Sequence, residues 1–144
     1  MFDEMFPNME INIKNIQSFN ISIIFAMLFR NNNLYKLKNK LWELKIPNKT
    51  IDEIVFLLKL KNNLMDLNMI PTLQKERKRF KISDNIIKEF SNIFKLNNKY
   101  VKAFINFDPK IDAREIMKKG FKGKEIGMEK NRLEIEEFKT LLKR

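Results

Sequence analysis

Apolar residues recur at intervals of three and four along most of the chain, which is the spacing of one face of an α-helix. The clearest segment runs from Leu34 to Leu44, where Leu37 and Leu41 continue one apolar stripe and lysines occupy the opposite side. A segment over about 20–30 is apolar nearly all round, so we expect a buried central helix there; a strand is conceivable over 21–25, but the length favours a helix. The same periodicity predicts further helices over about 50–67, 85–96 and 124–142, and one more short helix around 100–105, before Asp108-Pro109.

Residues that start and stop helices punctuate this pattern. Ser18 or Asn20 can cap the first helix, and Ser83 can cap the helix that begins near 85. Thr50 opens the helix over 50–67 by the same logic, and we expect Pro71 to end that unit.

The pattern predicts an all-α fold of about seven or eight short helices, with antiparallel neighbours, short loops and no sheet. A chain of 144 residues, 44% of them hydrophobic, can build one domain with a core, or a short row of helix pairs. We expect a helical domain over 18–144, preceded by a lead-in segment over 1–17 that Pro7 interrupts. Trp42 lies beside the apolar stripe of its helix, and packing is a more typical role for it than a stacking platform.

Composition excludes several kinds of chemistry. The chain has neither cysteine nor histidine, so it can form no disulfide and supplies no thiol nucleophile, no imidazole base and no Cys/His zinc site. No apolar run approaches the roughly 18 residues of a membrane span, and the acidic N-terminus lacks the plan of a secretory signal. We therefore expect a cytoplasmic or organellar-matrix protein with no membrane partner.

The net charge of +11 favours a nucleic-acid partner, although a bias towards Lys, Asn, Ile and Phe accounts for part of the lysine excess. The distribution of the charge matters more than its total. The densest basic run lies just after Pro71, and it is either a solvated helix face or a surface that neutralises phosphates. Its candidate RNA-binding residues are Lys75, Arg77, Lys78 and Arg79.

All three glycines of the chain lie in one stretch, 111–132, in a G-x-x-G-x-x-x-G spacing. Asp112 can cap a short helix, Gly120 can end it in a left-handed conformation, and Gly123 is permissive just before a new helix begins near Lys124. This predicts a tight helix–turn–helix. Its glycines serve backbone geometry alone, or they help the new helix's N-terminus to hold a phosphate. The candidate RNA-binding residues here are Lys118, Lys119, Gly120, Lys122, Gly123 and Lys124.

The same stretch resembles the C-terminal signature of the bacterial-type class II CCA-adding tRNA nucleotidyltransferases and poly(A) polymerases. That signature runs from an isoleucine–serine–glycine step, through an acidic residue and an apolar pair, to a Gly-Pro-x-Ile-Gly entry into a last helix. This chain departs from it in Asp112-Ala113 for serine–glycine, in Glu115 for aspartate and in Lys124 for proline. The matching positions are Ile111, Glu115, Ile116, Met117, Gly120, Gly123, Ile126 and Gly127.

A second, weaker match lies upstream, in the stretch LKIPNKTIDEIVFLLKL. It is similar to a leucine-rich step of the same family that precedes an amphipathic helix; Pro47 replaces the usual serine, and Leu44, Ile46, Asn48 and Ile54 match. The two matches occur in the family's order, and together they imply the helical body and tail, which hold the upper part of tRNA near its TψC arm.

The family's catalytic head has no counterpart in this sequence. Nucleotidyl transfer needs a carboxylate pair that holds metal ions, and the family carries it as a Gly-Ser followed by Asp-x-Asp. This chain has no such run, and no arginine-bearing motif for selecting CTP or ATP. We therefore expect no catalytic residues and no cofactor in this chain; Mg²⁺ and CTP or ATP would belong to a separate head domain.

Two classes of function remain. The first is a tRNA- or RNA-binding helical portion of a nucleotidyltransferase, not catalytic alone. Its head is a separate chain, or the sequence is a fragment, or the tail has been retained for binding alone. The second is a non-catalytic basic helical subunit of a larger ribonucleoprotein assembly. Both predict structured RNA as a partner, and the first also predicts a separate catalytic chain.

Overall fold

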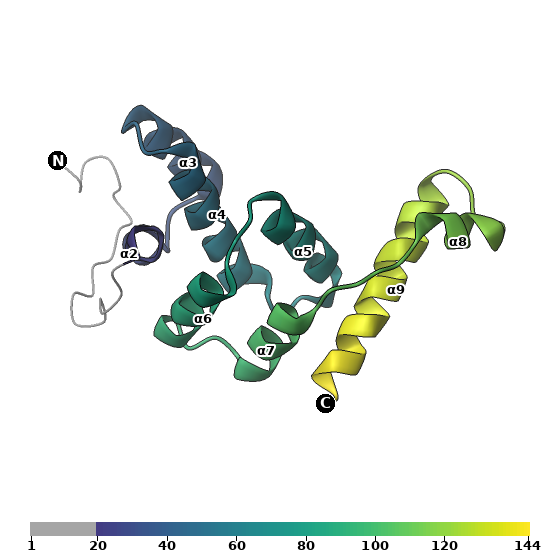
Figure 1. Ribbon diagram of the computed structural model, residues 1–144. Coiled ribbons are helices and arrows are strands. Elements are labelled where there is room, and N and C mark those ends of the chain that lie inside the picture. The colour runs from purple at the N-terminus through teal and green to yellow at the C-terminus, as the bar shows by residue number, and fades with distance from the viewer. Residues whose placement is uncertain (1–19) are drawn as a thin grey trace.

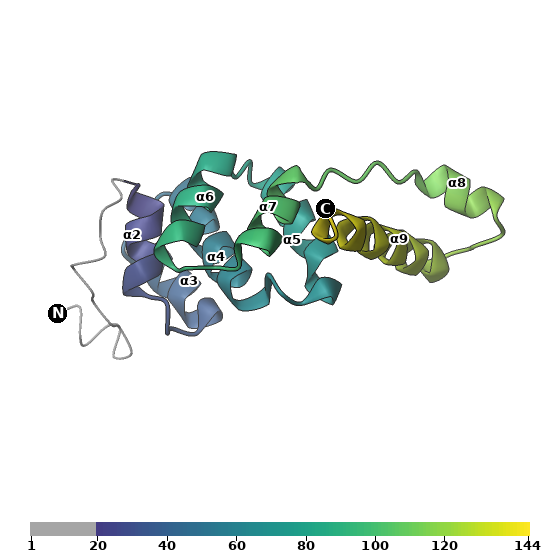
Figure 2. The ribbon, with the colours of Figure 1, turned by 90° about the horizontal axis from the view of Figure 1, so that it is seen from below.

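The computed structural model describes residues 20–144, and every regular element in this range is a helix (Figures 1 and 2). The all-α prediction is confirmed, while the predicted lead-in segment over 1–17 lies outside the described residues. The elements are α2 (Ile21–Leu28), α3 (Leu34–Glu43), α4 (Asn48–Asn63), the 3-10 helix η2 (Leu67–Met69), α5 (Ile70–Arg79), α6 (Asp84–Ile93), α7 (Asn98–Asn106), α8 (Ala113–Lys118) and α9 (Lys124–Leu142).

The central helix is α4, which packs against α2, α3, α5 and α6. Its 16 residues are long enough to bury side chains on several sides, among them Ile54, Phe56 and Leu57. The expectation that the segment over 20–30 forms the central helix is wrong. α2 has only eight residues, and Ile21 keeps 58% of its surface exposed, so one face of α2 covers α4 and the other faces outward.

α3, α5 and α6 end in the same way, although no glycine marks their ends. In each case a lysine takes a left-handed backbone conformation and the next residue is apolar. After α3, the Lys45 N–H donates to the Trp42 carbonyl at 2.9 Å and the Ile46 N–H donates to the Leu41 carbonyl at 3.1 Å, which is the Schellman pattern. This turn sends the chain back along the helix it has just left. The three lysines are Lys45, Lys81 and Lys95.

Only some of the residues predicted to start or stop helices do so. Asn20 and Ser83 cap α2 and α6 through their side chains, as expected. Thr50 does not open α4, which begins two residues earlier at Asn48, after Pro47. Pro71 does not end a helix but stands in the first turn of α5, where a proline's missing N–H costs nothing because that donor has no partner within the helix.

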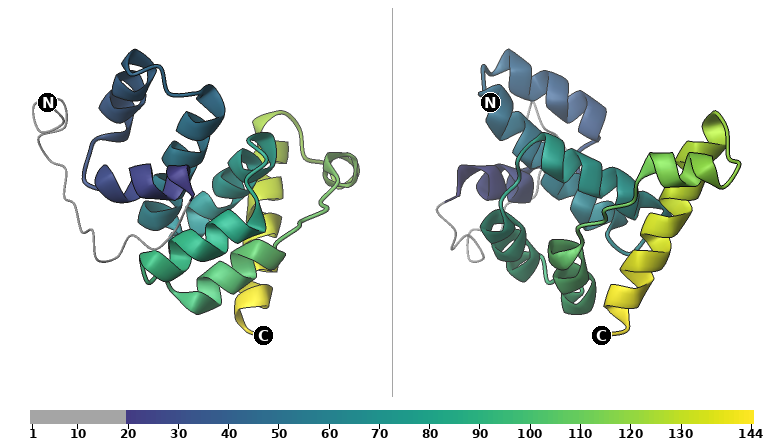
Figure 3. Two further views of the ribbon diagram at one scale, coloured as in Figure 1. Left: turned by 60° about the vertical axis from the view of Figure 1, so that its left-hand side comes forward. Right: turned by 45° about the vertical axis from the view of Figure 1, so that its right-hand side comes forward.

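α9 has the predicted bounds, and it carries the chain away from the main body. Its C-terminal part packs on α5 and α7 through Phe138, which is fully buried with its ring centroid 5.4 Å from Phe107 and 6.2 Å from Tyr100. Its N-terminal part pairs with α8 and projects from the α2–α7 body (Figures 2 and 3). We call this projecting unit, residues 111–142, the α8–α9 hairpin.

Candidate nucleic-acid interface

The turn of the α8–α9 hairpin has the backbone that the sequence predicts. Asp112 caps α8 by accepting a hydrogen bond from the Arg114 N–H at 2.8 Å. Gly120 ends α8 with φ = +101°, and Gly123 stands at the N-cap of α9 with φ = +61°. A Cβ added at either glycine would meet no atom within 4 Å. The two glycines are therefore required by their left-handed conformation and not by a crowded neighbourhood.

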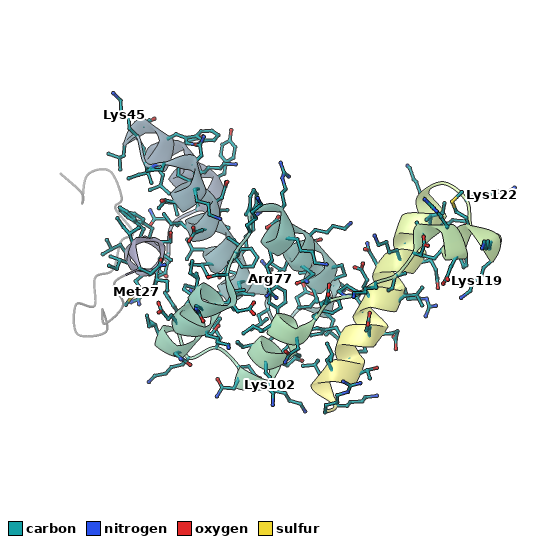
Figure 4. All side chains as sticks on the ribbon, in the orientation of Figure 1. Met27, Lys45, Arg77, Lys102, Lys119 and Lys122 are labelled. Atoms are coloured by element: carbon teal, nitrogen blue, oxygen red, sulfur yellow. The ribbon has the colours of Figure 1, made fainter. Side chains whose placement is uncertain are left out.

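Four lysines surround this turn, and all four are exposed. Lys119 and Lys122 lie at the end of the hairpin farthest from the body (Figure 4). Gly123 has no side chain to cap α9, so the first N–H groups of that helix receive no side-chain cap. We call Lys118, Lys119, Lys122 and Lys124 the lysine turn; with the helix N-terminus they form a positively charged, accessible tip.

Two acidic residues of α9 lie near this tip: Glu125 in the first turn of the helix, and Glu129, which is paired. Glu129, one turn into α9, accepts hydrogen bonds from the Arg132 guanidinium, and this bonding lowers the pKa of the Glu129 carboxyl. Lys119 makes a smaller contribution in the same direction. Glu129 is therefore ionised and already paired within α9, so it withdraws little charge from the lysine turn.

The basic run of α5 does not form one surface. Arg77 points into the body: its guanidinium donates to the Phe104 and Ile105 carbonyls at 3.1 and 3.3 Å and pairs with Asp84. Its side chain keeps only 14% of its surface exposed (Figure 4). This arginine therefore ties the end of α7 to α5, and its charge is used inside the protein.

The other three residues of the run are exposed but differ in their surroundings. Lys78 forms an ion pair with Asp108 at 3.0 Å, and this hydrogen bond lowers the pKa of the Asp108 carboxyl. Arg79 lies over the ring of Phe80, and Lys75 is close enough to α9 to influence Glu134. The second RNA surface stays a prediction, and of its four residues Lys75, Lys78 and Arg79 are exposed.

The prediction that Trp42 packs against the body is wrong. The indole keeps 51% of its surface exposed, and its N–H donates to the Asn48 side chain at 3.2 Å. On the same helix, Tyr35 is 78% exposed. The sequence carried a signal for this, because at 3.6 residues per turn positions 35, 38 and 42 share a face turned by roughly 120° from the leucine stripe.

Sequence reasoning also missed the basic surface of α7. Two shallow grooves, of about 430 and 530 Å³, flank this helix and share Lys102 and Asn106. Lys88 lines the first groove and Lys99 the second, and neither groove is lined by a carboxylate side chain. Lys88 comes from α6 and the other two lysines from α7, so the packing of these two helices brings them to one surface.

Within residues 20–144, no three acidic side chains gather in a way that could hold a metal ion. In that same range, no helix has the length and apolar character needed to cross a membrane.

Comparison of the chain with family models, with curated proteins and with solved structures finds no match in any of the three.

Proposed function

We propose that this chain is an RNA-binding helical module and that the lysine turn is its principal contact with RNA phosphates. The observation that carries the proposal is the concentration of four exposed lysines at the tip of a projecting hairpin, beside a helix N-terminus with no side-chain cap. Phosphate oxygens suit both features, because lysine ammonium groups and free backbone N–H groups are donors with positive charge.

The resemblance to the body and tail of the CCA-adding enzymes supports structured RNA, and tRNA in particular, as the partner. In that proposal this chain binds the RNA, and a separate polypeptide carries the metal-binding carboxylates and binds the nucleotide. RNA recognition of this kind reads the shape and backbone of the RNA and not its sequence.

A non-catalytic subunit of a ribonucleoprotein assembly is the second candidate. It is favoured by two exposed methionines beside the lysine turn, Met117 at 56% and Met128 at 71% exposure. Exposed methionines are typical of adaptable protein-binding surfaces. In this case a protein would cover the hairpin and the RNA contact would be secondary.

The test is a charge reversal at the tip. Lys122→Glu together with Lys124→Glu should weaken tRNA binding and reduce the slope of log K against log salt by one to two units, because each lost phosphate contact removes nearly one. Electrophoretic binding at several salt concentrations measures both quantities, and circular dichroism checks that the helical signal is unchanged.

The matched control makes the same charge change at the other end of α9, with Lys139→Glu and Lys143→Glu. This pair should have a clearly smaller effect, because neither lysine belongs to the lysine turn. Equal losses from both pairs would mean that net charge alone attracts RNA, and the assignment of the contact to the lysine turn would be wrong.

A further inference from the structure

The outer face of α3 combines exposed aromatic rings with positive charge. Tyr35 and Trp42 are the two exposed rings, and Lys38 stands between them on the same face. Two rings at positions i and i+7 of a helix lie about 10.5 Å apart along its axis. That is about three steps of a stacked nucleic-acid strand at roughly 3.4 Å each.

The indole ring of Trp42 is held in place while part of its surface stays open. Its N–H is satisfied by the Asn48 side chain at the start of α4, so the ring's remaining interactions are those of its faces and edges. Lys38 places its ammonium 5.2 Å from the centre of the ring. An exposed cation–π contact is weaker than the stacking of a base on an aromatic ring, so a base can displace this lysine.

A cleft of about 440 Å³ opens beside Trp42, between α3, α4 and the end of α5. Arg79 and Phe80 line its α5 side, so the cleft also borders a cation and a further ring. Two carboxylates also line the cleft: Glu76 is paired with Lys59 at 3.1 Å, and Asp52 remains as one negative charge against Lys38 and Arg79.

The charge around this face is net positive. Residues 34–49 contain five lysines and one glutamate, Glu43, which lies 3.4 Å from Lys40. Lys49 is used within the protein, because it lies 3.9 Å from Glu53 and donates to the Phe80 carbonyl. Lys45 extends outward from the tip of the α3–α4 turn (Figure 4). A partner for this face must therefore be negatively charged and must carry flat rings. A nucleic-acid strand with unpaired bases has both properties, whereas a duplex hides its base faces.

We propose that the outer face of α3 is a stacking platform for single-stranded RNA. Bases stack on Trp42 and Tyr35, while Lys38, Lys45 and Arg79 neutralise the phosphates. The proposal rests on RNA as the chain's partner, and it adds a second surface, distinct from the lysine turn, that reads unpaired nucleotides. A structured RNA would then be held by its backbone at the hairpin and by a loop or an end at α3.

The chain's single tryptophan makes the platform directly observable, because tryptophan emission reports Trp42 alone. A short single-stranded oligoribonucleotide should quench this emission on binding, and a blunt RNA duplex of equal length should quench it much less. Tyr35→Leu should weaken the oligonucleotide's affinity by about five- to a hundredfold, the range for losing one base stack. At low salt, Lys38→Glu should reduce the oligonucleotide's affinity more than Lys88→Glu does. Lys88→Glu is the control, because it makes the same charge change on α6.

Binding of a fluorescently labelled oligonucleotide, followed by anisotropy, provides the readout for Trp42→Leu, which should lose affinity as Tyr35→Leu does. Two results would overturn the platform: binding without quenching, or unchanged affinity in both aromatic variants. Quenching by an acidic peptide and not by RNA would equally reject it and would make the face a protein-binding surface. The variant Lys122→Glu/Lys124→Glu should still be quenched by the oligonucleotide, so a failure at the lysine turn and a failure at α3 are distinguishable.

Discussion

At the scale of single residues, Glu134 is the side chain whose environment opposes its charge. It is buried on α9, and this burial raises the pKa of its carboxyl above the ordinary 4.5, while Lys130 and Lys75 act in the other direction and Glu137 reinforces the rise. The Glu134 carboxyl therefore holds its proton to a higher pH in the folded protein than in the unfolded chain. As the pH rises from 4.5 through the raised pKa, ionisation of this buried group lowers the free energy of unfolding.

Glu134→Gln should therefore raise the free energy of unfolding near neutral pH. It should leave this free energy almost unchanged at a pH of about 4, where the Glu134 carboxyl is largely protonated in both the folded and the unfolded protein. Urea denaturation across this pH range measures the difference. Glu43→Gln, the same substitution at an exposed position of α3, is the matched control. A gain at Glu134 that is the same at both pH values would indicate that the charge is not its cause.

The residue type at a position predicts the local backbone conformation only where a single residue type strongly prefers that conformation. Gly120 has the predicted left-handed conformation, and the permissive position predicted at Gly123 also has a positive φ, because glycine adopts that region without strain. Lys45, Lys81 and Lys95 adopt it too, and lysine carries no such preference. What selects the conformation there is the apolar residue that follows each lysine and packs back on the helix, a tertiary requirement that the lysine itself does not show.

At the scale of elements, Arg77 joins α5 to the end of α7. Arg77→Met keeps the aliphatic stem but removes the donors that bind the Phe104 and Ile105 carbonyls, so it should lower the free energy of unfolding by about 2–3 kcal/mol. Arg79→Met, two residues on and exposed, should change it by about 0.5 kcal/mol or less. Chemical denaturation measures both. If Arg77→Met left stability intact but weakened RNA binding, Arg77 would be an RNA contact after all.

The two predicted RNA surfaces, the lysine turn and the basic run of α5, differ in whether local sequence or the tertiary fold positions their residues. The lysine turn could be predicted because its residues are neighbours in sequence and one turn gathers them whatever the rest of the fold does. The α5 run could not, because the fate of Arg77 depends on carbonyls 27 and 28 residues away. The helix starts follow this rule as well. The start of α9 is predicted by Gly123, whereas Pro71 is equally compatible with the end of one helix and the start of another.

At the scale of the whole molecule, the all-α class followed from periodicity, but the position of each helix relative to the core did not. The segment over 20–30 is the more apolar, yet α4 is central because its length allows it to contact four other helices. Periodicity reports which face of a helix is buried, and it does not report how many neighbours bury it.

An aromatic cluster at the junction of the body and the α8–α9 hairpin is the subject of the last prediction. Phe138 is fully buried and contacts both Tyr100 and Phe107, so it fixes α9 against α7 and the chain that follows it. Phe138→Ala should leave a cavity at this junction and lower the free energy of unfolding by about 3–5 kcal/mol. Met128→Ala lies on the same helix but is 71% exposed, so it should cost about 0.5 kcal/mol or less. Urea denaturation of the two variants compares them directly. If the two losses were equal, Phe138 would not be what holds the hairpin to the body.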